Sequence, residues 1–167
     1  MRKFPVYIFF LFLSACVASH TDAYYGFRLS GAISKYDGQK IILRQLDMIN
    51  ALRREKGFQP LIVSNELNAS AKTHALDIYN QKRAWNFGSD ASSPQERGRV
   101  SGYDGIVSGE NVSETYEGEF SVLQVWLKYP ISRDVILNPL STHFGLGWYQ
   151  ENDGKTWWVQ DIGQADR

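Results

Sequence analysis

A chain of 167 residues, 43% hydrophobic and 14% aromatic, is long enough for one compact domain with a core and too short for two large ones. Its 18 Lys and Arg residues balance 18 Asp and Glu residues, so neither a basic surface for nucleic acid nor an acidic disordered tail is expected. The composition predicts a single globular domain, and the balanced charge of the chain indicates no particular class of partner.

Residues 1–15 show the pattern of a signal peptide for export. Arg2 and Lys3 give a basic start, and an apolar run extends from Phe4 to about Ser14. The run has about a dozen residues, whereas a membrane-spanning helix needs roughly 20. It ends in Leu-Ser-Ala-Cys at 13–16, which resembles the bacterial lipobox, in which the cysteine is lipidated and the signal is cut just before it.

Cys16 is the only cysteine, so no internal disulfide can form and the one thiol stands where a lipobox requires it. We therefore predict that lipid on Cys16 anchors the protein to a membrane of the bacterial envelope. Two or more acyl chains make such an anchor stable. The alternative is a cysteine inside an ordinary signal peptide that is discarded. By resemblance to lipoprotein sorting, Val17 favours the outer membrane, with the domain facing the periplasm or the exterior.

A tether over residues 16–38 is predicted to lead to a domain over residues 39–167. The aromatic residues Tyr24, Tyr25 and Phe27 argue against a fully free linker. Apolar residues at helical spacing, together with capping residues, then predict four helices. They cover Gln39–Lys56, followed by a capping Gly57; a segment opening at Ser64 or Asn65; a short segment starting at the Ser93 and Glu96 capping box; and about Glu117–Lys128, stopped by Pro130.

The end of the chain predicts strands instead. Aromatic and β-branched residues occupy His143–Gln150 and Thr156–Ile162, on either side of a turn that contains Asp153-Gly154. We expect these two segments to form an antiparallel hairpin. Helices first and a hairpin last predict an α+β or three-layer fold rather than a parallel βαβ fold.

Five strings in this order resemble the CAP superfamily, also called the SCP or PR-1 fold, in its bacterial form. They are INALRREKGFQPL at 49–61, LNASAKTHALDI at 67–78, GSDASSPQERGRVSGY at 88–103, GENVSE at 109–114, and VILNPLSTHFGLGWY with WWVQDIG between 135 and 163. The resemblance implies an α-β-α sandwich with an antiparallel sheet. It also implies a cleft that in many members holds two histidines and two acidic residues able to bind a zinc-like cation.

Only one of these four positions keeps a metal-binding side chain in this chain. Glu110 fills one acidic position, in what we expect to be a turn-like setting. Asn86 stands at the first histidine position, Ser132 at the second, and the other acidic position falls near Tyr129. Because three of the four positions have changed, the resemblance implies no metal ligands and no cofactor in this chain, although zinc binding is not ruled out by it.

We predict a ligand-binding cleft formed by Asn86, Glu110, Ser132 and His143, in which Glu110 is mainly a scaffold carboxylate that accepts hydrogen bonds from a partner such as Asn86 or Ser132. His74 falls beside the apolar stripe of a helix, and a hydrogen-bonded structural role is expected for it. His143 precedes a strand and can reach the mouth of the cleft.

Three functions remain open. The first is a non-catalytic binding or interaction module, whose ligand is a lipid, a glycan or another envelope protein. The second is a peptidase-like hydrolase that uses Glu110, Ser132 and His143 in a rearranged site. The third is a structural role through an exposed aromatic patch, although the tryptophans at 148, 157 and 158 are more simply explained by core packing.

Overall fold

The computed structural model describes residues 32–34, 36–115 and 117–165. The predicted signal peptide, the lipidation site Cys16 and most of the predicted tether lie outside the described residues. Within the described part of the chain, no helix combines the length and the apolar character needed to cross a bilayer.

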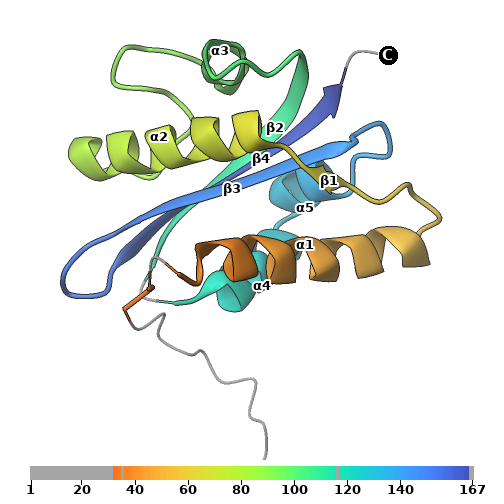
Figure 1. Ribbon diagram of the computed structural model, residues 1–167, viewed down its shortest axis with the longest axis horizontal. Coiled ribbons are helices and arrows are strands. Elements are labelled where there is room, and N and C mark those ends of the chain that lie inside the picture. Colours follow the sequence, from red (N-terminus) through yellow and green to blue (C-terminus); the bar gives the residue numbers. More distant parts are fainter. Residues whose placement is uncertain (1–31, 35, 116, 166–167) are drawn as a thin grey trace, which may run out of the picture.

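A four-stranded sheet lies between two layers of helices, as Figure 1 shows. The strands are β1 (Ile62–Val63), β2 (Gly105–Thr115), β3 (His143–Gln150) and β4 (Thr156–Ala165). One face carries α2 (Asn65–Gln81) and α3 (Pro94–Val100), and the other carries α1 (Gly38–Glu55), α4 (Glu119–Lys128) and α5 (Pro130–Ile136). The predicted α+β sandwich of three layers is confirmed.

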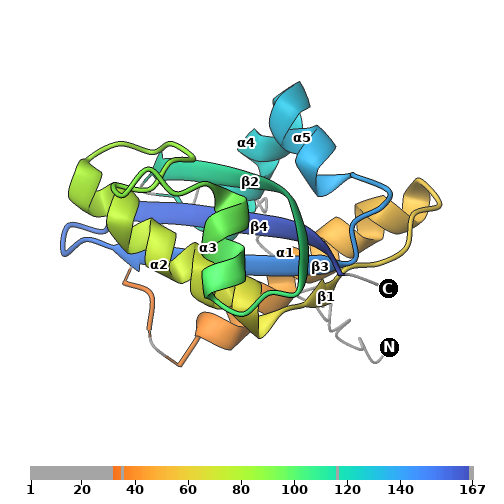
Figure 2. The ribbon, with the colours of Figure 1, turned by 90° about the horizontal axis from the view of Figure 1, so that it is seen from above.

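The strands are arranged in the order β1-β3-β4-β2, so β1 and β2 lie at the two edges. Figure 2, seen from above, shows α2 and α3 lying over β3, β4 and β2. The predicted hairpin is present as β3 and β4, and β2 pairs antiparallel with β4. The expected antiparallel sheet differs in one detail: it is mixed, because β1 pairs parallel with β3 through two residues.

The four predicted helices are present, and two of them, α2 and α3, begin at the predicted capping residues. Ser64 caps α2 by accepting from the amide of Leu67 at 3.1 Å. Ser93 and Glu96 form the expected capping box at the start of α3. Helix starts of this kind can be predicted from the sequence because the capping side chain and the amide that it caps lie within three residues of each other.

The elements that the sequence analysis missed are β1, β2 and α5. Glu110 does not lie in a turn: it lies in the middle of the eleven-residue strand β2, opposite Asp161 of β4. Strand β4 pairs with Gly105–Val107 and with Gly109–Thr115, and the register shifts at a bulge between these two stretches.

The two faces of the sheet are packed differently. The larger apolar core lies between the sheet and α1, α4 and α5, and includes the fully buried Trp158 and Phe144. On the other face, α2 approaches β3 closely because Gly145 and Gly147 leave no side chain between them: a Cβ on either glycine would overlap the α2 backbone. A smaller core around Trp157 lies at one end of this face.

Arg53 fixes the far end of α1 without any carboxylate partner in the described residues. Its side chain is fully buried and donates to the backbone carbonyls of Gln59, Ile136, Asn138 and Ser141 at 2.9–3.0 Å. Burial lowers the pKa of the guanidinium. Four carbonyl acceptors compensate for the lost hydration, so that one side chain joins α1 to the loop that enters β3.

The outer edge of β2 is covered by side chains rather than by another strand. Gln95 donates to the carbonyl of Gly105 at 3.0 Å and accepts from the amide of Val107 at 2.8 Å, as a neighbouring strand would. The Asn86 amide and the Trp126 indole donate to carbonyls farther along the same strand. These contacts satisfy backbone groups that an uncovered edge strand leaves available.

Candidate functional site

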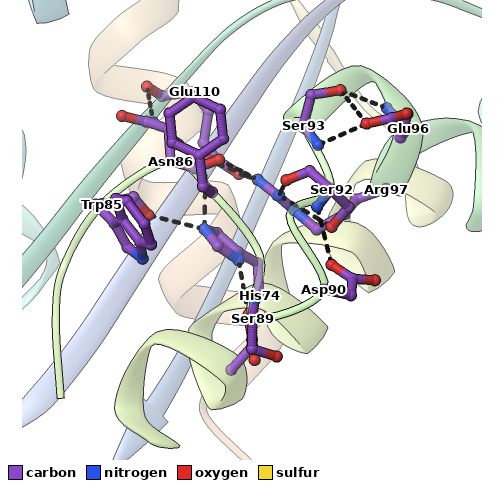
Figure 3. A network of polar contacts seen from close by, with 12 residues as sticks. His74, Trp85, Asn86, Ser89, Asp90, Ser92, Ser93, Glu96, Arg97 and Glu110 are labelled. Atoms are coloured by element: carbon purple, nitrogen blue, oxygen red, sulfur yellow. Dashed lines mark hydrogen bonds and ion pairs between the residues drawn. The ribbon is translucent and has the colours of Figure 1, made fainter. Parts of the chain in front are cut away.

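Glu110 is the centre of a buried polar cluster on the face of the sheet covered by α2 and α3. Its side chain is fully buried, and it points to the same face as Asp161, the residue paired with it on β4. The neighbouring Asn111 points to the opposite face, because side chains alternate along a strand. Figure 3 shows the side chains that converge on Glu110 from α2, α3 and the loop between them.

Arg97 binds both oxygens of Glu110. Its Nη2 lies 2.9 Å from Oε1 and 2.8 Å from Oε2, and the Asn86 amide donates to Oε1 at 3.1 Å. Arg97 also donates to the backbone carbonyls of Ser92 and Asn86. The guanidinium therefore neutralises the carboxylate and at the same time holds the loop between α2 and α3 against β2 (Figure 3).

His74 comes from α2 and completes the cluster above Glu110. Its ring is fully buried, and Nε2 lies 2.9 Å from the carbonyl oxygen of Trp85 and 3.6 Å from Oε1 of Glu110. Because a carbonyl can only accept, Nε2 carries the proton. Burial lowers the pKa of His74, the Glu110 charge opposes this shift and the Arg97 charge adds to it. The predicted buried, hydrogen-bonded histidine is confirmed.

Asp161 is the unusual member of the cluster. It is fully buried beside Glu110, and neither of its carboxyl oxygens makes a hydrogen bond within the described residues. Burial, and after it the negative charge of Glu110, raise the pKa of Asp161 well above its ordinary value. The uncharged carboxylic acid is therefore favoured there, because burial and the Glu110 charge outweigh the Ser70 hydroxyl and the Arg97 charge, which favour the ionised form.

A cavity of about 340 Å³ lies between α2, the following loop and α3, next to this cluster. Val100 is the one lining residue with a wholly apolar side chain, and the others carry hydroxyl, carboxylate, imidazole or guanidinium groups. They are Ser70, Thr73, His74, Asp77, Ser89, Asp90, Ser92, Glu96, Arg97 and Ser101. Such a lining suits a small polar ligand that offers several hydrogen-bonding groups.

The structure brings together two of the four residues predicted to form the cleft. Asn86 and Glu110 are hydrogen-bonded as expected. Ser132 lies on α5, on the other face of the sheet, where its carbonyl accepts from Asn111. His143 lies at the start of β3, with Nδ1 2.9 Å from the Thr142 hydroxyl. In the described residues no hydrogen bond or ion pair joins Ser132 or His143 to Glu110.

The residues present do not fit the cation that the family's cleft can hold. No group of three or more histidine, cysteine or carboxylate side chains in the described chain has the geometry to hold a metal ion. The one family carboxylate, Glu110, is bound on both oxygens by Arg97, whose guanidinium already supplies the positive charge. These residues therefore do not form a cation site of the kind found in the family.

Arg97 and Asp161 were missed in the sequence. Arg97 reaches Glu110 from a different element 13 residues away, and no local pattern connects the two. Asp161 did carry a signal, because a single acidic residue stands inside the otherwise buried string of β4, from Thr156 to Gly163. An ionisable residue in a fully buried strand is rare enough to mark a site for inspection.

Comparison with known proteins agrees with this architecture. Residues 46–162 match the model of CAP, the cysteine-rich secretory protein family. The uncharacterized protein YkwD of Bacillus subtilis (strain 168) is 26% identical over 133 residues, which is 80% of this chain and 49% of that protein. The chain thus spans about half the length of the curated relative that it matches.

Two solved structures have a similar fold. An extracellular protein containing a SCP domain from Bacillus anthracis str. Ames has a TM-score of 0.69 and 18% identity, over 81% of this chain and 45% of that chain. An outer surface protein from Borrelia burgdorferi has a TM-score of 0.68 and 17% identity, over 77% of this chain and 95% of that chain. At such identities the likeness concerns the fold alone.

We expect the Arg97–Glu110 pair to contribute strongly to stability. Arg97→Gln should lower the free energy of unfolding by about 3 kcal/mol, because it leaves a buried carboxylate without its counterion. Glu110→Gln should also destabilise, and the double variant should lose clearly less than the sum of the two single losses. Urea unfolding measures all three. Lys40→Gln, which breaks an exposed ion pair with Asp37, is the control and should change little. Additive losses would contradict a direct pair.

We expect Asp161→Asn to change the pH dependence of stability. The raised pKa means that folded Asp161 binds a proton more tightly than unfolded Asp161, so its favourable contribution is present below the ordinary pKa of 3.8 and is lost as the pH rises through the folded pKa. The variant removes this loss and should be the more stable protein at pH 7, by about 1 kcal/mol or more. Thermal unfolding from pH 4 to pH 8 measures it. A constant difference across this range would contradict the assignment.

Proposed function

The chain belongs to the CAP family of cysteine-rich secretory proteins, and we propose that it is a non-catalytic binding module that works outside the cytoplasm. In this proposal the cavity between α2 and α3 is the ligand site. The ligand is a small polar molecule or a polar part of a larger one, such as a sugar unit of a glycan.

The observation that carries this proposal is that both carboxylate oxygens of Glu110 already accept hydrogen bonds. A general base must have an oxygen free to take a proton from a nucleophile within hydrogen-bond reach. Here both oxygens accept from Arg97 and one also accepts from Asn86. His74 is likewise committed, with Nε2 directed to the Trp85 carbonyl. In this proposal Glu110 and His74, the groups available for hydrolysis, instead hold the loop above the sheet.

The lining of the cavity favours a polar ligand over a lipid. Lipid chains need an extended apolar surface, whereas the apolar surface of this cavity is interrupted by hydroxyl and carboxylate groups, including Asp77, Asp90 and Glu96. The bound Arg97 and the neutral form of His74 leave these acidic side chains as the main charge at the site. Ligands with hydroxyl or amino groups are therefore better suited to it than fatty acids or sterols.

The proposed location rests on the sequence and on the similar proteins. The predicted lipid on Cys16 would hold the domain at a membrane of the bacterial envelope. Two proteins of similar fold are described as an extracellular protein and as an outer surface protein. These descriptions support export of this chain, with the outer membrane as the proposed site of attachment.

We expect ligand binding to depend on the cavity mouth. Thr73→Trp places an indole at an exposed lining position of α2, so it should block the cavity while the fold is kept. Leu76→Trp is the matched control, because Leu76 is also exposed on α2 but does not line the cavity. The measurement is the thermal shift of each protein with mono- and disaccharides, amino sugars and fatty acids.

Polar compounds, and not fatty acids, should raise the unfolding temperature of the unmodified protein and of Leu76→Trp, and have no effect on Thr73→Trp. An equal shift in Thr73→Trp would place binding elsewhere. Hydrolysis of peptide or glycan substrates that is lost in Glu110→Gln, at a temperature where this variant is folded, would overturn the non-catalytic role.

We also expect Cys16→Ser to release the protein from the membrane. In a bacterial host, the unmodified chain should partition into the detergent phase and carry the mass of a lipid, since two or more acyl chains make attachment stable. Cys16→Ser should appear only in the aqueous phase. Ser19→Ala, three residues further on, keeps the lipobox and should behave like the unmodified chain. Detergent partition of Cys16→Ser at the unmodified level would contradict lipidation.

A further inference from the structure

A second cavity, of about 380 Å³, lies on the opposite side of the domain from β2, at the edge of β3. It is bounded by the start of α1 on one side of the sheet and by α2 on the other, and the strand edge at Leu146, Gly147 and Trp148 forms its wall. Ile33 and Ser34, near the beginning of the described chain, close one end of it. We call this cavity the β3-edge groove.

The backbone of β3 has hydrogen-bonding capacity left in this groove. Alternate residues of β3 direct their amide and carbonyl groups away from β4: the carbonyl of Phe144 accepts from Ser64, and the amide of Leu146 donates to the Asn68 side chain. Strand β1 ends at Val63, so it pairs with β3 no farther than Phe144. By the same alternation, the carbonyl of Leu146 and both backbone groups of Trp148 point away from β4, and no hydrogen bond to them is found within the described residues.

These free groups match the pattern required by one more parallel strand. A residue of a parallel strand donates to the carbonyl of one residue and accepts from the amide two positions further along its neighbour. Leu146 and Trp148 offer that carbonyl and that amide. An added strand here would continue the line of β1, which also runs parallel to β3. Exposed sheet edges of this kind are known recognition sites for extended peptides.

We propose that residues Tyr25–Leu29 of this chain dock in the β3-edge groove as an additional strand. The segment lies only a few residues before Ile33, whose amide already donates to the Gln150 side chain at the end of β3. This short connection gives the segment a high effective concentration at the groove. Because Ile33 is held near Gln150, a docked segment would run toward Gln150, in the same direction as β3.

The side-chain pattern of the segment fits the groove. Tyr25, Phe27 and Leu29 alternate with Gly26 and Arg28, so a strand over these residues has one apolar face. Ile42, Leu146 and Trp148 offer apolar side chains on the α1 side of the groove, all packed in the larger core. The apolar face of the segment would extend that core, and Gly26 and Arg28 would face the α2 side.

Hydrogen exchange of the Trp148 amide tests this proposal. The protein is the full chain from Cys16 onward with Cys16→Ser, which keeps it soluble. The Trp148 amide should exchange at least tenfold more slowly than an unbonded amide. Phe27→Asp should abolish this protection, because the charged side chain cannot be buried. Arg28→Asp is the control, since it introduces the same carboxylate on the α2 side, while also removing the Arg28 charge, and should leave exchange unchanged. The Val159 amide in the central strand reports that each variant is folded.

Equal exchange of Trp148 in the starting protein and in Phe27→Asp would overturn the proposal, whether both exchange fast or both slowly. Fast exchange in both would mean that the edge is open. Slow exchange in both would mean that another segment or a second copy covers it, and dependence on protein concentration would identify the second copy. Equal loss of protection in Arg28→Asp would also overturn the proposal, because the face of the segment would then not matter.

Discussion

The pairing of Arg97 with Glu110 organises the polar half of this domain. A carboxylate buried beneath a helix is costly unless its charge is matched and its oxygens are satisfied, and the guanidinium does both. The same guanidinium binds backbone carbonyls of the loop between α2 and α3, so the position of the loop depends on the charge in the sheet. The cavity beside the loop exists in its present shape because this contact holds one of its walls.

The two faces of the sheet differ in the kind of side chains that they bury. Packing against α1, α4 and α5 supplies most of the apolar burial, and the fully buried Arg53 lies at one end of this layer. The face under α2 holds the apolar cluster around Trp157 at one end and the titratable cluster of His74, Glu110 and Asp161 next to it. The pKa values of His74 and Asp161 move in opposite directions, and in both cases burial favours the uncharged form. The charges that this cluster buries are therefore mainly those of Arg97 and Glu110, which pair with each other.

The sequence predicted what depends on neighbours along the chain. Helices capped by Ser64 and Ser93 and the β3–β4 hairpin follow from short-range signals. Resemblance to a family placed Asn86 beside Glu110, which is correct, but it also placed Ser132 there. The strand β2 explains the difference: Glu110 and Asn111 point to opposite faces, and Ser132 lies on the face of Asn111. Arg97 could not be predicted, since only the fold brings α3 over β2.

The covering of β2 by Gln95, Asn86 and Trp126 gains importance if the domain is held at a membrane. Anchored molecules share a thin layer, so neighbouring copies meet far more often than they would in free solution at the same total amount. A long bare strand would let each encounter extend the sheet from one molecule into the next. Side chains that imitate a neighbouring strand remove this possibility at the β2 edge, so that crowded copies would not associate through this strand.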